Sequence, residues 1–204
     1  MKILVVYYSM YGHVFKLAQA VAEGAGSVPG AEVVMRRVED LPFNEKKLQE
    51  SKHAQKTLEE QKDIPICTPE DLKTADGVLF GTPTRYGNMT AQMKALFDQT
   101  AELWVKGALE GKPAGIFTST ATTHGGQETT GFTMMPPLLH LGMIIVGVPY
   151  STPGMLHTEG RGGTPYAAST VAGSQGELTP TPEDLEIARA LGRRVAEITR
   201  KLRG

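Results

Sequence analysis

The sequence has a single cysteine, no long hydrophobic run and almost no excess charge, and each absence excludes a class of protein. Cys67 stands alone among 204 residues, so an internal disulfide or a thiolate metal cluster is impossible. No apolar run approaches the roughly 18 residues of a membrane helix. The 21 Lys and Arg nearly balance 22 Asp and Glu, which disfavours binding to nucleic acid. We therefore expect a cytoplasmic protein without membrane insertion.

Two nucleotide-binding motifs and the usual metal-ligand spacings are also missing. The sequence contains neither GxGxxG nor GxxxxGK[ST], so a dinucleotide fingerprint and a triphosphate-hydrolysing loop are both absent. The five histidines form no HxH or HxxxH pair. We therefore predict no metal site.

Five short runs rich in β-branched and aliphatic residues predict strands. They are nearly continuously apolar, which is typical of a parallel sheet covered by helices on both faces. Apolar residues at helical spacing follow the first and third runs, and a final helix is predicted to begin after Thr181. This alternation predicts one α/β domain over residues 1–204, a doubly wound sheet of five parallel strands. The expected strands are Ile3–Tyr8, Val33–Val38, Gly77–Gly81, Ala114–Thr118 and Met143–Val148.

Two stretches fit this pattern less well. Asn44–Asp63 is dense in Lys, Glu and Gln, and we interpret it as a solvated helix or loop before the third strand, with no motif chemistry of its own. Ser151–Thr181 is rich in Gly, Thr, Ser and Pro. A structureless loop of that length is uncommon in a compact domain, so we expect it to be functional or to lie at a subunit contact.

The first strand runs into the segment SMYGHV, which has the composition of an anion-binding loop. Backbone N–H groups at the turn around Gly12 and at the following helix start can converge on a phosphate. Hydroxyl groups of Ser9 and Tyr11 add further donors. The segment contains no lysine, which favours a stably bound monophosphate. Taken alone, it is equally compatible with an ordinary connection between a strand and a helix.

Two further polar loops follow the third and fourth strands. GTPTRYGN, Gly81–Asn88, combines the restricted backbone of Pro83 with a stacking face on Tyr86 and a positive charge on Arg85. STATTHGGQ, Ser119–Gln127, follows the fourth strand. The carboxyl ends of parallel strands lie at one edge of the sheet. We therefore expect the three loops to form a single site.

Motifs spread from Tyr7 to Thr170 carry a family resemblance. YYSMYGH, FGTPTRYGNM, LFDQTAELW, GGQE and RGGTPYAAST resemble the WrbA family of FMN-dependent NAD(P)H:quinone oxidoreductases, a branch of the flavodoxin-like fold. The resemblance implies one FMN per subunit, a homotetramer, and NADH or NADPH as electron donor to a quinone. Nicotinamide and quinone would use the same space in turn, which implies ping-pong kinetics.

The resemblance also implies roles for individual residues. His140 would lie near the flavin, Trp104 and Tyr11 would surround nicotinamide and quinone, and His140 and Arg85 would be the catalytic candidates that stabilise developing negative charge. The sequence departs from the family pattern at Ala121, Thr123, His124 and Ala167. The implied FMN-binding residues are Ser9, Met10, Tyr11, Gly12, His13 and Val14, then Pro83, Thr84, Arg85, Tyr86, Gly87 and Asn88, then Ser119, Thr120, Ala121, Thr122, Thr123, His124 and Gly125, together with His140.

Other interpretations remain open at this stage. A lone histidine such as His140 is often a helix-end residue, and Trp104 on an apolar helix is often a core or interface residue. Asp98 fits a cap or an interface hydrogen bond, so we do not assign it a catalytic role. Two other functions compete: a flavodoxin-like one-electron carrier, which would usually have an acidic surface, and a regulatory protein-binding module.

Overall fold

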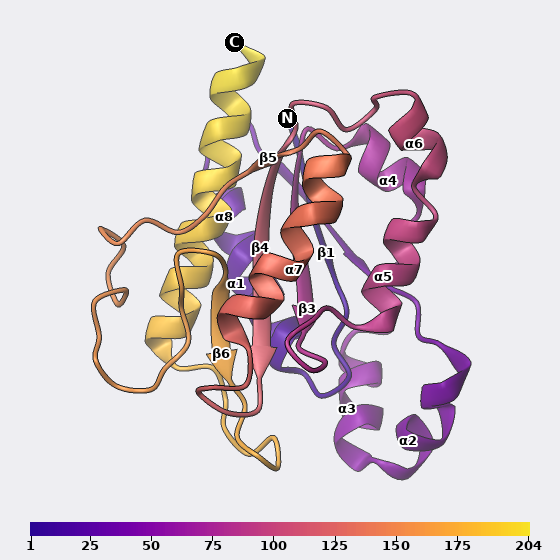
Figure 1. Ribbon diagram of the computed structural model, residues 1–204, viewed down its shortest axis with the longest axis vertical. Coiled ribbons are helices and arrows are strands. Elements are labelled where there is room, and N and C mark those ends of the chain that lie inside the picture. Colours follow the sequence, from indigo (N-terminus) through magenta and orange to yellow (C-terminus); the bar gives the residue numbers. More distant parts are fainter.

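The computed structural model describes residues 1–204 and is built around one parallel sheet (Figure 1). Strands β1 (Lys2–Tyr7), β3 (Gly77–Pro83) and β4 (Pro113–Thr120) form its centre, and β2 (Glu32–Arg37) lies at one edge. The order is β2-β1-β3-β4-β5, with every pairing parallel. The predicted α/β fold with five strand positions is therefore confirmed.

The fifth position of the sheet is shared by two short strands. β5 (Ile144–Ile145) pairs with the start of β4, and β6 (Ala168–Val171) pairs with its end. The prediction of one strand over Met143–Val148 is wrong beyond Ile145, because the chain turns away there and Val148 donates from its N–H to the carbonyl of Pro165. The stretch 151–181, for which no strand was predicted, contains β6.

Helices α1 (His13–Gly26) and α8 (Pro182–Arg203) cover one face of the sheet, where they lie side by side (Figure 1). Their backbones approach closely: a Cβ at Gly192 would lie 2.0 Å from the carbonyl oxygen of Val21. The predicted cap of α8 is present, because Thr181 Oγ1 accepts from the N–H of Asp184 at 3.1 Å.

The other face is covered by α4 (Pro69–Thr74), α5 (Ala91–Asp98) and α7 (Gln127–His140), with α6 (Ala101–Val105) beyond α5. The turn η1 (Pro42–Asn44), α2 (Glu45–Glu50) and α3 (Lys52–Glu60) follow β2. The predicted solvated character holds for α2, which buries no residue, whereas α3 buries Ala54 and Thr57. None of the helices combines the length and the apolar character needed to cross a membrane.

Candidate functional site

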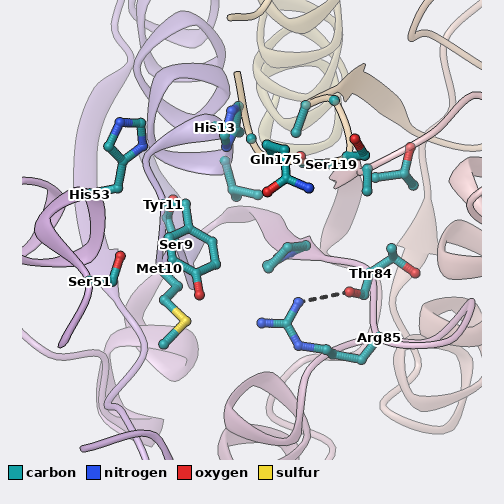
Figure 2. A pocket seen from close by; sticks show the side chains of 18 of the residues that line it. Ser9, Met10, Tyr11, His13, Ser51, His53, Thr84, Arg85, Ser119 and Gln175 are labelled. Carbon is teal, nitrogen blue, oxygen red and sulfur yellow. Dashed lines mark hydrogen bonds between the residues drawn. The ribbon is translucent and has the colours of Figure 1, made fainter. Parts of the chain in front are cut away.

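Loops from the carboxyl ends of β1, β3 and β4 meet at one edge of the sheet and line a cavity of about 640 Å³ (Figure 2). This volume is in the range of small-molecule and cofactor pockets, about 300–1,000 Å³. Eleven of the residues implied by the sequence line it: Ser9, Met10, Tyr11, His13, Val14, Pro83, Thr84, Arg85, Ser119, Thr120 and Ala121. The convergence of three loops expected from the sequence is therefore present.

The loop after β1 presents unpartnered backbone donors to this cavity. Gly12 adopts φ +91°, and Ser9 Oγ accepts from the N–H groups of Gly12 at 3.2 Å and Phe15 at 3.1 Å. The N–H groups of Tyr11, His13 and Val14 donate no hydrogen bond within the chain. The first turn of α1 carries no acidic residue. Free N–H groups at the positive end of a helix fit a phosphate.

The loop after β3 is held by hydrogen bonds around Thr84. Its N–H donates to the carbonyl of Ser119 at 2.9 Å, and its Oγ1 accepts from the N–H of Gly87 at 3.1 Å and from the hydroxyl of Thr130. Arg85 Nη1 donates to the carbonyl of Thr84 at 2.9 Å (Figure 2). Arg85 forms no ion pair with a carboxylate, so its positive charge is available at the cavity.

The tip of this loop projects into solvent. Tyr86 is fully exposed and adopts φ +54°, the one positive φ in the chain at a residue other than glycine. Such strain in a bulky residue is typical of functional loops. Tyr86, Gly87 and Asn88 lie next to the cavity-lining residues of the loop but do not line the cavity themselves.

The loop after β4 turns away from the cavity after its first three residues. The hydroxyl of Thr120 donates to the carbonyl of Thr122 at 2.8 Å, and the N–H of Gly125 donates to the same carbonyl at 3.0 Å. Residues 122–125 therefore do not line the cavity. Thr122, Thr123 and His124 are exposed to solvent.

A fourth loop also lines the cavity. It lies within the stretch 151–181, which was expected to be functional or at a subunit contact, but none of its residues was assigned to the site. Ala172–Gly176 follows the carboxyl end of β6 and turns at Gly173 and Gly176, with φ values of +84° and +74°. His13 Nε2 lies 2.9 Å from the carbonyl oxygen of Leu178, which joins the loop to the start of α1. The sequence contained only a weak signal, because AASTV at 167–171 includes Ser169 and Thr170, although it precedes AGSQG as the other strands precede their loops.

Helix α3 also contributes to the cavity wall, through its first residues Lys52 and His53 and its N-cap Ser51. The interpretation of 44–63 as a segment without chemistry of its own was therefore incomplete. No local pattern could have indicated this contact, because the segment reads as an ordinary charged surface helix.

Comparison with known proteins places the chain in a family. Residues 1–155 match the family described as NADPH-dependent FMN reductase. The chain belongs to this family. Two relatives, from Geobacter metallireducens and Geobacter sulfurreducens, are 50% and 52% identical over 206 residues, with 100% of each chain covered, and both are named NAD(P)H dehydrogenase (quinone). The family membership expected from the sequence motifs is therefore confirmed.

Solved structures agree with the fold of this FMN reductase family member. A WrbA-like flavodoxin protein from Agrobacterium tumefaciens aligns with a TM-score of 0.65 at 24% identity over 98% of both chains. Flavodoxin 2 from Bacillus cereus aligns with a TM-score of 0.61 at 18% identity over 97% of this chain and 99% of its own. The flavodoxin-like architecture expected from the sequence is therefore confirmed.

His140 and Trp104 do not reach the cavity of their own chain. Both line a second depression of about 470 Å³, formed by α5, α6 and the end of α7. α7 begins beside the loop after β3, where a Cβ at Gly126 would lie 2.9 Å from Gly87 Cα, and His140 is its last residue. Fourteen helical residues span about 20 Å. Both side chains are exposed.

Proposed function

We propose that this FMN reductase family member is an FMN-dependent NAD(P)H:quinone oxidoreductase that reduces quinones to hydroquinones by two-electron transfer. The observation that carries the proposal is the cavity, which is lined both by the loop whose Tyr11, His13 and Val14 N–H groups are free and by residues 83–85. The full-length relatives named NAD(P)H dehydrogenase (quinone) support the same activity.

The residues of the cavity fit FMN as its resident cofactor. The loop 9–14 binds the phosphate through N–H groups and the Ser9 hydroxyl, which accepts two N–H bonds and keeps its own proton free to donate. The ring system would be held by the cavity-lining parts of the next two loops, residues 83–85 and 119–121. FMN, when bound, supplies the hydride chemistry, and the protein supplies binding and orientation.

Arg85 is the proposed electrostatic group of the cavity. Its bond to the carbonyl of Thr84 fixes the guanidinium, and no carboxylate neutralises it. A fixed positive charge stabilises negative charge that develops on a quinone oxygen. Arg85→Ala is expected to lower kcat for quinone reduction more than it changes the affinity for FMN.

We propose that the active form is a homotetramer in which His140 and Trp104 act on the site of a neighbouring subunit. Trp104 is 59% exposed, and Val105 and Leu139 beside the same depression are also exposed. Exposed apolar side chains gathered together mark interaction surfaces. Mixed assemblies of Arg85→Ala and His140→Ala subunits should then recover activity that neither parent has. Mixed assemblies no more active than the parents would contradict the shared site.

We propose further that residues 1–204 form a single domain, that the protein is cytoplasmic, and that NADH or NADPH is its electron donor.

Nicotinamide and quinone are expected to occupy the same cavity one after the other, which predicts ping-pong kinetics. Initial rates at several concentrations of each substrate should give parallel lines in double-reciprocal plots. Intersecting lines would show that both substrates bind together.

The decisive test is anaerobic mixing of the FMN-loaded protein with NADH, followed by benzoquinone, while the oxidised-flavin absorbance is recorded. Loss of the absorbance with NADH and its full, rapid recovery with quinone are expected. FMN binding without loss of absorbance would favour the one-electron carrier. Failure to bind FMN would overturn the proposed function.

A further inference from the structure

We propose that Lys52, with His53 beside it, binds the phosphate group of FMN and supplies the cationic group that the loop 9–14 lacks. This inference rests on the proposed function. It assigns a ligand-binding role to α3, a helix whose sequence carries no recognisable motif.

Helix α3 packs directly on the loop 9–14. Ala54, Thr57 and Gln61 form one buried face at helical spacing. A Cβ at Gly12 would lie 3.2 Å from Thr57 Oγ1, so helix and loop are in close contact at the turn. Gln61 Nε2 donates to the carbonyl of Ser9 at 3.1 Å in a buried hydrogen bond. The helix is therefore held in a defined position against the loop.

This packing places the first residues of α3 at the cavity wall. Lys52 lines the same cavity as Ser9–Tyr11 and His13. So do its neighbours Ser51 and His53, which Figure 2 shows. Burial, with a smaller contribution from the nearby charges of Lys16 and His53, lowers the pKa of His13. His53 of α3 and His13 of α1 both line the cavity (Figure 2).

Lys52 differs from the other lysines of its segment because it both lacks an ion pair and lines the cavity. Lys47 also lacks an ion pair, but it does not line the cavity. Lys46, Lys56 and Lys62 each pair with a glutamate on the same segment, whereas Lys52 forms no ion pair in the chain. None of the nineteen residues that line the cavity is Asp or Glu. Lys52 therefore presents an uncompensated positive charge to a cavity that otherwise offers neutral donors at this end.

A phosphate monoester is the ligand group that suits this arrangement. The loop 9–14 offers N–H and hydroxyl donors without a formal charge, whereas the phosphate of FMN carries between one and two negative charges near neutral pH. A lysine ammonium acts as a point charge for phosphate. Riboflavin has the same ring system without the phosphate, so it reports on all other contacts of the site.

The test compares FMN and riboflavin binding to the full-length Lys52→Gln variant. Lys56→Gln is the matched control, because Lys56 lies on the same helix, is exposed and does not line the cavity. Dissociation constants are measured by quenching of flavin fluorescence. We expect Lys52→Gln to raise the Kd for FMN about tenfold, with the Kd for riboflavin unchanged. Lys56→Gln should alter neither, and Lys52→Arg should restore most of the FMN affinity.

Three results would overturn the inference. An equal loss of FMN and riboflavin affinity in Lys52→Gln would show that the residue only supports the fold of α3. An unchanged Kd for FMN, with a rise confined to the KM for NADPH over NADH, would assign Lys52 to the donor's phosphate instead. If the wild-type protein bound neither FMN nor riboflavin, the proposed function would be wrong, and Lys52 would have no FMN phosphate to bind.

Discussion

Gln61 Nε2 donates a buried hydrogen bond of 3.1 Å to the backbone carbonyl of Ser9, and this bond joins the end of α3 to the loop that follows β1. Gln61 and Ser9 are 52 residues apart in the sequence. The bond holds a helix of surface composition against the candidate phosphate site, so the stability of the helix and the geometry of the loop are coupled.

Replacement of Gln61 by Leu is expected to destabilise the protein. The carbonyl of Ser9 would lose its buried partner, which costs about 1–3 kcal/mol of the free energy of unfolding, and removal of the unpartnered Gln61 Oε1 offsets part of that loss. FMN affinity should fall as well, because the loop is less restrained. Urea unfolding of the FMN-free variant measures the first effect. Gln55→Leu, at an exposed position of the same helix, is the control, and equal stability of the two variants would contradict the coupling.

Loss of the hydroxyl group is expected to have opposite effects on stability at Tyr7 and at Tyr8. The hydroxyl of Tyr7 is buried without a hydrogen-bond partner, whereas that of Tyr8 donates to Asp40 at 3.0 Å and accepts from Asn44 at 3.1 Å. Tyr7→Phe should leave stability unchanged or raise it by about 1 kcal/mol, and Tyr8→Phe should lower it by about 1 kcal/mol or more. Thermal and urea unfolding of both variants checks the difference. A larger loss in Tyr7→Phe would contradict it.

A side chain at Gly12 is expected to destabilise the protein. Its φ of +91° disfavours an L-residue, and a Cβ would meet Thr57 Oγ1 at 3.2 Å. Gly12→Ala should lose about 1–2 kcal/mol of stability and weaken FMN binding. Gly30 has φ +80° with no heavy atom within 4 Å of a Cβ, so Gly30→Ala isolates the backbone cost. If Gly12→Ala and Gly30→Ala bind FMN with the same affinity in a titration, the contact with Thr57 does not affect FMN binding.

His13 is expected to make stability depend on pH. Burial lowers its pKa from 6.5, and the charges of Lys16 and His53 act in the same direction, whereas the carbonyls of Leu178 and Gly176 oppose the shift. Folding therefore favours the neutral ring. The stability that results is present above pH 6.5 and is lost as the pH falls through the lower pKa of the folded state.

The measurement compares wild type and His13→Gln by urea unfolding between about pH 7.5 and 5. The free energy of unfolding of the wild type should fall more steeply with decreasing pH than that of the variant. Parallel curves would show that the ring does not change its protonation on folding. Replacement of His53 by Gln should raise the pKa of His13, which NMR titration of the ring protons would detect.

Cys67 is expected to be unreactive in the folded protein. Burial, reinforced by the negative charge of Asp71, raises the pKa of its thiol to about 12. The thiolate is the reactive form, so labelling with a disulfide reagent at about pH 8 should be slow in the native state and rapid in urea. Rapid labelling of the native protein would contradict the buried position of the side chain.

Local patterns in the sequence were sufficient for most of the sheet and for the loops at its edge. Continuous apolar runs predict buried parallel strands, and glycine or proline beside hydroxyl residues predicts the turns at Gly12 and Pro83. These features depend on neighbours a few residues away, as does the capping box that Thr181 forms with Asp184. The family motifs lie in the same segments.

The contacts that complete the cavity were decided by tertiary structure. Lys52 lines it because Thr57 and Gln61 pack on a loop some 50 residues earlier, and no local pattern encodes that pairing. β6 is short, and it is stable because it pairs with the end of β4.

His140 and Trp104 differ from the other predicted site residues because tertiary structure, and not local sequence, decides where they lie. Their motifs mark them in the sequence, yet the length of α7 carries His140 away from the cavity of its own chain. Sequence by itself determined which residue types follow each strand, because burial and turn geometry are local constraints. Only the tertiary structure decided which of those residues share a space, because long-range packing sets the distances between them.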